Sequence, residues 1–195
     1  MVSLVAHPGT ANEAVRRVAA RVEVAGADSL RFQYVLEADL RQVRIPPPVA
    51  DAGRADRLWV HTCFEAFVGL PESSAYLELN FSSSGQWAAY RFDSYRQGMT
   101  PALEVAPRLV RQVREQRLEL EAEVSLDGIL PPGPGPGPRT PRELRLRIGL
   151  STVVEDREGR LSYWALRHPP GRPDFHHPES FSLVLEPLTY PLNSK

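Results

Sequence analysis

The sequence predicts an all-β fold, an antiparallel β-sandwich of the jelly-roll or immunoglobulin-like kind with two packed sheets and about ten strands. Apolar and polar residues alternate through most of the chain, turn residues separate the alternating stretches at short intervals, and almost no stretch favours a helix. Many short alternating strands bury their apolar faces best when two antiparallel sheets pack together.

The first two strands are expected to form a hairpin near the N-terminus. Residues 18–24 and 31–37 each alternate between apolar and polar side chains, and the turn residues Gly26–Asp28 lie between them. Residues 11–20 also tolerate a short helix, and this alternative stays open at the level of the sequence. Residues 45–57 are expected to form an extended loop, because three consecutive prolines remove backbone donors from any strand ladder.

Three alternating stretches follow at residues 58–68, 75–82 and 86–93, and their two faces differ in composition. One face is mostly apolar and is predicted to be core: Val60, Thr62, Phe64, Ala66, Val68, Leu77, Leu79, Phe81, Ala88, Tyr90 and Phe92. The other face mixes aromatic and hydrogen-bonding groups: Trp59, His61, Cys63, Glu65, Phe67, Tyr76, Glu78, Asn80, Ser82, Trp87, Ala89, Arg91 and Asp93. An ordinary solvent face has fewer aromatic residues, so this second face is predicted to bind a ligand.

The turns between these stretches predict how the strands pair. A turn centred on residues 71–72 would pair Glu65 with Glu78, and a two-residue turn at 84–85 would pair Glu78 with Arg91. Glu65, Glu78 and Arg91 would then form one row across the sheet. Paired residues have Cβ atoms about 4.5–5.5 Å apart, so the two carboxylates would repel, and either Arg91 or a ligand must offset that repulsion.

The second half of the chain supplies the remaining strands. Residues 118–124 carry acidic side chains and residues 144–150 carry basic ones on their polar faces, so these two stretches are predicted to pair. Residues 131–138 alternate Pro and Gly and are expected to be a surface loop between them. Further strands are predicted at residues 161–166 and 181–185.

Composition indicates one domain spanning residues 1–195. Its 23 basic and 24 acidic residues give a net charge of -1, which disfavours nucleic acid or an anionic membrane as a partner. Cys63 is the only cysteine, which excludes an internal disulfide and predicts a buried small side chain rather than a nucleophile. We find neither a signal-peptide pattern nor a run of about 20 apolar residues, so a cytoplasmic location is expected. The oligomeric state stays open.

Several strings resemble a bacterial branch of the DOMON-like ligand-binding domains, which are also similar to carbohydrate-binding module family 9. They are WVHTCFEAF (59–67), LNFSSSGQW (79–87), YRFDSYR (90–96), LSYWAL (161–166) and PDFHHP (173–178). The resemblance covers most of residues 58–185. It implies a β-sandwich that holds a sugar or haem on one sheet and has no catalytic activity of its own.

We therefore predict a non-catalytic domain that binds a small polar ligand, expected to be a sugar or a cell-wall glycan fragment. Sugar sites combine flat rings that stack on C–H faces with fixed polar groups that bind hydroxyls. The predicted binding residues are Trp59, His61, Glu65, Glu78, Asn80, Trp87 and Arg91, with a secondary set of Trp164, His168, His176 and His177. In the alternative interpretation, the tryptophans pack under a loop and the charged residues form a structural ion network.

Other functions remain open. Haem could be held by His61 and Met99, the methionine and histidine pair of part of the DOMON superfamily, but no cofactor is predicted because no haem-attachment motif is present. A glycoside hydrolase could use Glu65 and Glu78 as its carboxylate pair if direct pairing set them about 5–5.5 Å apart. A structural or interaction module would instead use an apolar patch elsewhere.

The histidine-rich loop gives one more alternative. His168, His176, His177 and Asp174 could converge on a metal ion, but their spacing matches no closed zinc site, so no metal is predicted. The simpler expectation is that Phe175 plugs the end of the core and that the histidines bond to backbone groups.

Overall fold

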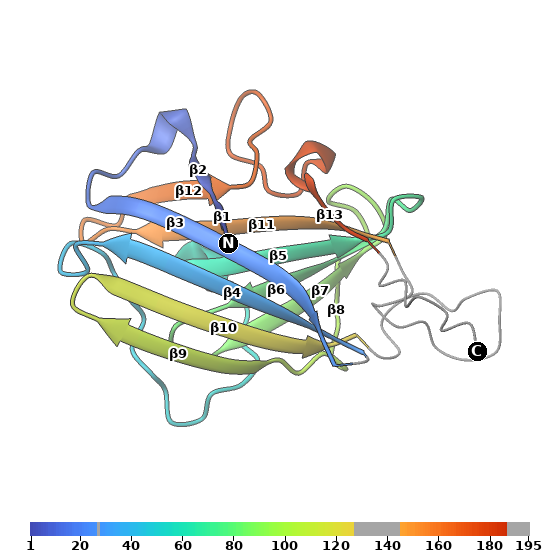
Figure 1. The fold of residues 1–195 in the computed structure, drawn as a ribbon, viewed down its shortest axis with the longest axis horizontal. Helices are drawn as coiled ribbons and strands as arrows, with labels where there is room; N and C mark the ends of the chain where they lie inside the picture. Colours follow the sequence, from blue (N-terminus) through green and yellow to red (C-terminus); the bar gives the residue numbers. More distant parts are fainter. Residues whose placement is uncertain (27, 127–144, 187–195) are drawn as a thin grey trace, which may run out of the picture.

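The computed structural model describes residues 1–26, 28–126 and 145–186 and confirms the predicted all-β sandwich. Two antiparallel sheets overlie one another, and the described residues contain three 3-10 turns but no α-helix (Figure 1). None of these helical segments is both long and apolar enough to cross a membrane. The predicted loop at residues 131–138 lies outside the described residues.

The five-stranded sheet has the order β1-β3-β4-β10-β9. Its strands are β1 (Val2–Ser3), β3 (Val15–Ala25), β4 (Ser29–Ala38), β9 (Arg108–Arg114) and β10 (Arg117–Ser125). β3 and β4 form the predicted N-terminal hairpin, with Glu23 opposite Arg31. The alternative helix over residues 11–20 is wrong, because β3 is already extended from Val15.

The predicted pairing of residues 118–124 with 144–150 is also wrong. β10 pairs with β4 and β9, so its acidic face already has basic neighbours in its own sheet, and Arg31 binds Glu123 at 2.8 Å. The basic stretch belongs to β11 in the other sheet. Opposite charges on two strands therefore did not identify partners, because β10 has basic partners within its own sheet and Arg147 of β11 donates to the backbone carbonyls of Leu70 and Ser73.

The eight-stranded sheet has the order β2-β12-β11-β5-β6-β7-β8, and β13 also pairs with β11. Its strands are β2 (Val5–Ala6), β5 (Cys63–Gly69), β6 (Tyr76–Phe81), β7 (Trp87–Phe92), β8 (Thr100–Pro101), β11 (Leu146–Glu155), β12 (Leu161–Ala165) and β13 (Leu183–Leu185). The 3-10 turns are η1 (Pro8–Thr10), η2 (Leu58–Val60) and η3 (Pro178–Ser180). Residues 58–60 are therefore not strand, and Val60 is 36% exposed rather than core.

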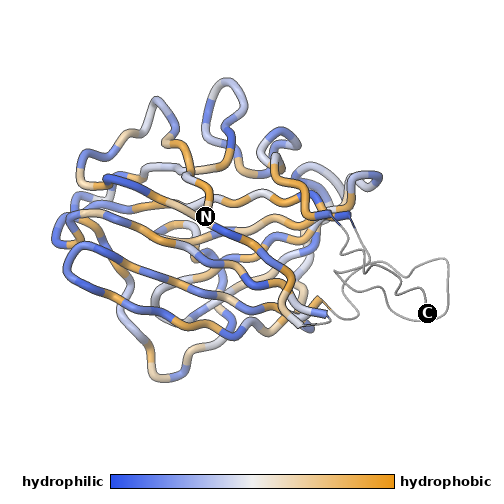
Figure 2. Tube along the Cα trace, in the orientation of Figure 1, coloured by the Kyte–Doolittle hydropathy of each residue, from blue (hydrophilic) through white to orange (hydrophobic). Residues whose placement is uncertain are grey.

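Apolar side chains fill two layers. The main core lies between the sheets, where Phe32 and Tyr34 pack against Phe81 and Phe64. Hydropathy alternates along the strands that enclose it (Figure 2). A second cluster covers the outer face of the eight-stranded sheet and comprises Phe67, Tyr76, Ala88, Tyr90, Phe92, Val153, Ala165, Phe175 and Phe181. This sheet is thus buried on both faces, with loop residues such as Phe175 over its outer one.

The first predicted register is displaced. Glu65 pairs with Asn80 and Phe67 pairs with Glu78, because the connecting loop spans residues 70–75 and is centred one residue later than predicted. A shift of the pairing by two residues keeps each side chain on its predicted face. Glu65 and Glu78 accordingly share the outer face as diagonal neighbours rather than direct partners.

The second predicted register is wrong by one residue. The loop has three residues, Ser83–Gly85, and Ser82 N donates to Gln86 O at 2.9 Å beneath it. Leu77 therefore pairs with Arg91, and every side chain of β7 points to the face opposite the predicted one. The outer cluster gains Ala88, Tyr90 and Phe92, whereas Ala89 joins the main core.

Candidate functional site

A pocket of about 700 Å³ opens on the outer face of the eight-stranded sheet. Strands β5, β6, β7, β11 and β12 supply its floor, and η2 and the loops at residues 96–99 and 173–176 supply its walls. Its lining residues are Trp59, Val60, Glu65, Glu78, Phe92, Arg96, Met99, Val153, Leu161, Tyr163, Pro173, Phe175 and His176. The size and the mostly apolar lining with a few polar groups are typical of small-molecule sites.

Two buried carboxyl groups lie on the pocket floor. Glu65 is 4% exposed and Glu78 is 5% exposed. Asn80 Nδ2 donates to Glu78 Oε1 at 2.7 Å, whereas Glu65 Oε1 has no hydrogen-bond partner within the described residues. A buried acceptor without a donor is energetically unfavourable, and the pocket is the space from which a donor can reach Glu65.

The two acids resist ionisation. Burial raises the pKa of Glu65 well above its ordinary value, and repulsion by Glu78 raises it further. Burial also raises the pKa of Glu78, against the lowering effects of the Asn80 bond and of Arg96. The pair can therefore donate a proton in a hydrogen bond or accept a cation, depending on what enters the pocket.

Arg96 is the only arginine that lines this pocket among the described residues, and its charge is already compensated. Its Nη2 binds Asp174 Oδ1 at 2.8 Å, and the Tyr95 hydroxyl donates to the same carboxylate. These bonds lower the pKa of Asp174 although its partial burial opposes the shift. Arg96 also has φ +55°, an uncommon conformation for a residue other than glycine, and its backbone N donates to Tyr76 Oη at 3.2 Å.

His176 is held as a neutral ring. Burial, aided by Arg96, lowers its pKa to about 4. The Tyr76 hydroxyl lies 2.8 Å from His176 Nδ1 and accepts from Arg96 N. His176 Nε2 lies 3.8 Å from Glu78 Oε2, too far for a direct hydrogen bond. His176 therefore presents a neutral polar ring to the pocket.

Aromatic rings fix the walls. Trp59 makes an edge contact with Tyr90 at 5.8 Å between ring centroids, and Phe92 stacks on Tyr76 at 4.8 Å. Phe175 contacts Tyr163 at 5.9 Å. Such contacts limit ring motion, so the pocket offers preformed apolar surfaces to a ligand.

The structure brings together only part of the predicted binding set. Trp59, Glu65, Glu78 and His176 line the pocket, and Asn80 orients Glu78 from beneath. The predicted row of Glu65, Glu78 and Arg91 does not exist, because the extra loop residue places Arg91 on the opposite face of the sheet. There Arg91 binds Glu104.

The other predicted residues lie elsewhere. His61 Nδ1 contacts Glu155 Oε2 at 2.7 Å, and Trp87 and Trp164 pack with the main core. His168 Nε2 lies 2.9 Å from Val5 O, and His177 Nδ1 accepts from Glu179 N at the start of η3. These two histidines do bond to backbone groups. Phe175 is buried, but it lies over the outer face of the eight-stranded sheet and does not plug the end of the main core.

Neither the haem pair nor the histidine cluster assembles as a site. Met99 lines the pocket but His61 does not. Within residues 1–26, 28–126 and 145–186, no group of three or more His, Cys, Asp or Glu residues is close enough to hold a metal ion. Arg96, Phe92, Tyr163 and Phe175 were missed as site residues, although the strings YRFDSYR, LSYWAL and PDFHHP contain them.

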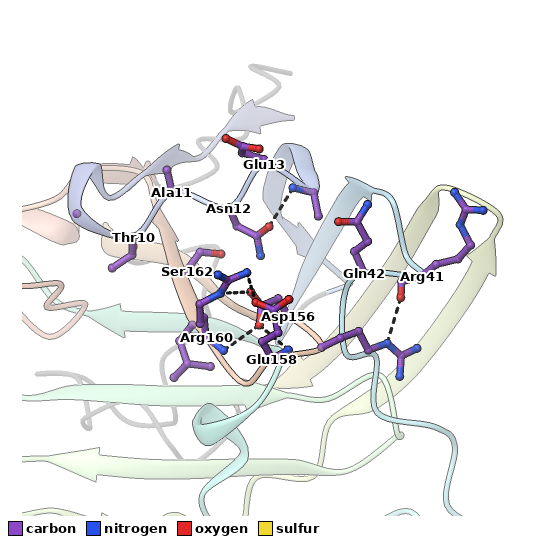
Figure 3. A pocket seen from close by; sticks show the side chains of 14 residues that line it. Thr10, Ala11, Asn12, Glu13, Arg41, Gln42, Asp156, Glu158, Arg160 and Ser162 are labelled. Atoms are coloured by element: carbon purple, nitrogen blue, oxygen red, sulfur yellow. Dashed lines mark hydrogen bonds and ion pairs between the residues drawn. The ribbon is translucent and has the colours of Figure 1, made fainter.

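A second pocket of about 670 Å³ lies between the loops at residues 9–14, 41–42 and 156–162. Its polar groups mostly bond to each other (Figure 3). Arg160 Nε donates to Asp156 Oδ2 at 2.7 Å, Asp156 Oδ1 accepts from two backbone N–H groups of its own turn, and Asn12 Oδ1 accepts from Ala14 N. These bonds stabilise the loops, and no buried unpaired side-chain atom points to a ligand there.

No protein-family model and no curated protein matches the sequence. A solved structure from Bacteroides uniformis, described as a candidate carbohydrate-binding protein, matches with a TM-score of 0.62 over 84% of this chain and 75% of that chain. The two chains share a fold. Their sequences are only 14% identical, so this likeness does not transfer site residues.

A second structural match is a carbohydrate-binding module of family 9 from Caldicellulosiruptor kristjanssonii, solved in complex with cellotriose. It covers 79% of this chain and 75% of that chain, with 11% identity and a TM-score of 0.36.

Proposed function

We propose that this protein binds a small polar ligand, a sugar or glycan fragment, in the pocket on the outer face of the eight-stranded sheet. One observation carries the proposal: Glu65 lines a preformed aromatic pocket, and its buried Oε1 lacks a donor among the described residues. An unsatisfied buried polar group costs about 1–3 kcal/mol, and a ligand hydroxyl or amine would remove that cost.

The remaining groups suit a sugar. Trp59 and Tyr163 offer rings for the C–H faces of a pyranose, Glu65 and Glu78 offer carboxyl oxygens, and the neutral ring of His176 offers a further hydrogen-bonding group. The description of the Bacteroides uniformis protein as a candidate carbohydrate binder supports the same ligand class. We also propose a cytoplasmic location, which fractionation of cells expressing the native protein would test.

A glycan array followed by titration calorimetry tests the proposal. Trp59→Ala should weaken binding by about tenfold or more, because ring stacking is lost. His61→Ala is the matched control: this predicted site residue does not line the pocket, so its loss should leave affinity unchanged. Equal affinity of the Trp59 variant and the unmodified protein would exclude this pocket as the sugar site.

A glycoside hydrolase is a second candidate because buried carboxyls with raised pKa are suited to general acid catalysis. The direct pairing of Glu65 with Glu78, from which a retaining carboxylate spacing was expected, is absent. Turnover of aryl glycosides that disappears in both Glu65→Gln and Glu78→Gln would establish the hydrolase; binding without turnover would establish the non-catalytic domain.

A further inference from the structure

We infer that the ligand carries a protonated amine, which makes it an amino sugar rather than a neutral one. This inference rests on the proposed function and specifies the chemistry of the same pocket. Three features support it: the charges around Glu65 and Glu78, the aromatic walls, and the unpartnered oxygen of Glu65.

Within the described residues the pocket has one cation, Arg96, which favours the ionised form of Glu65 and Glu78 but is shared with Asp174. Arg91, which the sequence placed beside them, lies on the opposite face of the sheet. Arg96 is bound to Asp174, so the Arg96–Asp174 pair contributes little net positive charge. His176 is neutral near pH 7. A ligand is therefore the remaining source of positive charge for the pair within the described part of the chain.

The walls favour an ammonium group. Cations bind favourably within about 6 Å of an aromatic ring face, most strongly at tryptophan, and Trp59, Phe92 and Tyr163 line the same pocket as the acids. Apolar walls also lower the local dielectric constant, which strengthens attraction between an ammonium and a carboxylate. The same surroundings repel a uronic acid, whose carboxylate would face Glu65 and Glu78.

The unpartnered oxygen of Glu65 favours a ligand that carries a strong hydrogen-bond donor. Glu65 Oε1 is buried and unpaired within the described residues, whereas Glu78 Oε1 accepts from Asn80. A neutral hydroxyl would satisfy the oxygen without stabilising the ionised form of either acid. An ammonium N–H would satisfy the oxygen and also stabilise the ionised carboxylate through a charge-assisted hydrogen bond.

The test compares three trisaccharides that differ only at C2: cellotriose with a hydroxyl, chitotriose with a free amine, and its N-acetylated form. Titration calorimetry with the full chain at pH 6.5 should show the amine form binding about tenfold tighter than either neutral form. Glu65→Gln should remove most of that preference, and Glu78→Gln provides a second variant in case the first fails to fold. Trp59→Ala should weaken every form that binds.

The binding results distinguish failure of the amine inference from failure of the proposed sugar site. Equal or tighter binding of the neutral sugars, lost in Trp59→Ala, would overturn the amine inference and leave the sugar site intact. An amine preference that both glutamine variants retain would also overturn it, because the acids would not be the recognition groups. Absence of binding by all three trisaccharides would count against both.

Discussion

Glu65→Gln is expected to stabilise the free protein while weakening ligand binding. Glutamine keeps the size of the side chain and cannot ionise. Glutamine still carries an unpaired oxygen but no charge, so the substitution removes the cost of burying an ionisable carboxyl beside Glu78, about 2 kcal/mol at pH 8. For a chain of this length, that gain raises Tm by about 4–8 °C.

The gain should depend on pH in a defined direction. The folded-state pKa of Glu65 lies well above its ordinary value of 4.5, so the native state keeps a proton that the unfolded chain has lost. Below pH 4.5 the carboxyl of Glu65 is protonated in both the folded and the unfolded state, so its raised pKa does not reduce the free energy of unfolding. As pH rises above 4.5, the unmodified protein loses stability relative to Glu65→Gln until the native carboxyl also ionises.

Chemical denaturation at pH 4, 6 and 8 measures this difference. Glu104→Gln is the matched control, because Glu104 is exposed, binds Arg91, and has a lowered pKa. Its loss should change the free energy of unfolding by less than about 1 kcal/mol, in the destabilising direction. A Glu65→Gln variant that is less stable than the unmodified protein at pH 8 would refute the reasoning, because Glu65 would then belong to a structural ion network.

Three further predictions concern single residues. Tyr76→Phe removes the hydroxyl that bonds His176, so calorimetry should show weaker ligand binding and a loss of about 1 kcal/mol in unfolding free energy; unchanged affinity would show that the ring needs no positioning. Gly85→Ala should cost about 1–2 kcal/mol in denaturant titration, because φ is +90° and the new Cβ would lie 2.9 Å from Ala52 Cβ; full stability would contradict the positive φ of Gly85 and its close approach to Ala52. Burial raises the pKa of the Cys63 thiol well above its ordinary value, so Cys63 should react with a thiol reagent only after denaturation; rapid native labelling, followed by absorbance, would contradict its burial.

The alternation of residues was sufficient to predict the sandwich and the faces of β5 and β6. Their pairing was displaced by two residues, which preserves parity, so Glu65 and Glu78 still share a face. The faces of β7 could not be predicted. Gly85 satisfies the positive φ of either a two-residue or a three-residue loop, so the turn residues do not choose between them.

Hydrophobicity does not resolve that ambiguity either. Because the eight-stranded sheet is covered on both sides, Tyr90 is buried in the outer cluster while Ala89 is buried in the main core. A strand with two buried faces lacks the contrast from which its register is normally inferred. The missed site residues, such as Arg96 and Phe175, lie on loops, and their placement depends on long-range contacts such as the bond between Arg96 and Asp174.

The register of β7 decides whether Glu65 and Glu78 have Arg91 as a cationic neighbour. If Arg91 had lain beside Glu78, a structural ion pair would have been a sufficient explanation for both carboxylates. With Arg91 on the other face and Arg96 bound to Asp174, the described fold retains two buried acids that reduce its stability above pH 4.5. Sites that reduce stability in this way are more often functional than structural.

Thermal unfolding at two pH values is a sensitive screen for the ligand. A ligand present at 100 times its Kd stabilises the native state by about 2.7 kcal/mol, so its binding raises Tm. If an amine neutralises Glu65 and Glu78, its binding should weaken as pH falls through the raised pKa values of the two acids, because protons then compete with the ammonium group. The Tm increase with chitotriose should therefore be larger at pH 7 than at pH 5, and this pH difference should be absent from Glu65→Gln; an increase that is larger at pH 5 would contradict neutralisation of the acids by the amine.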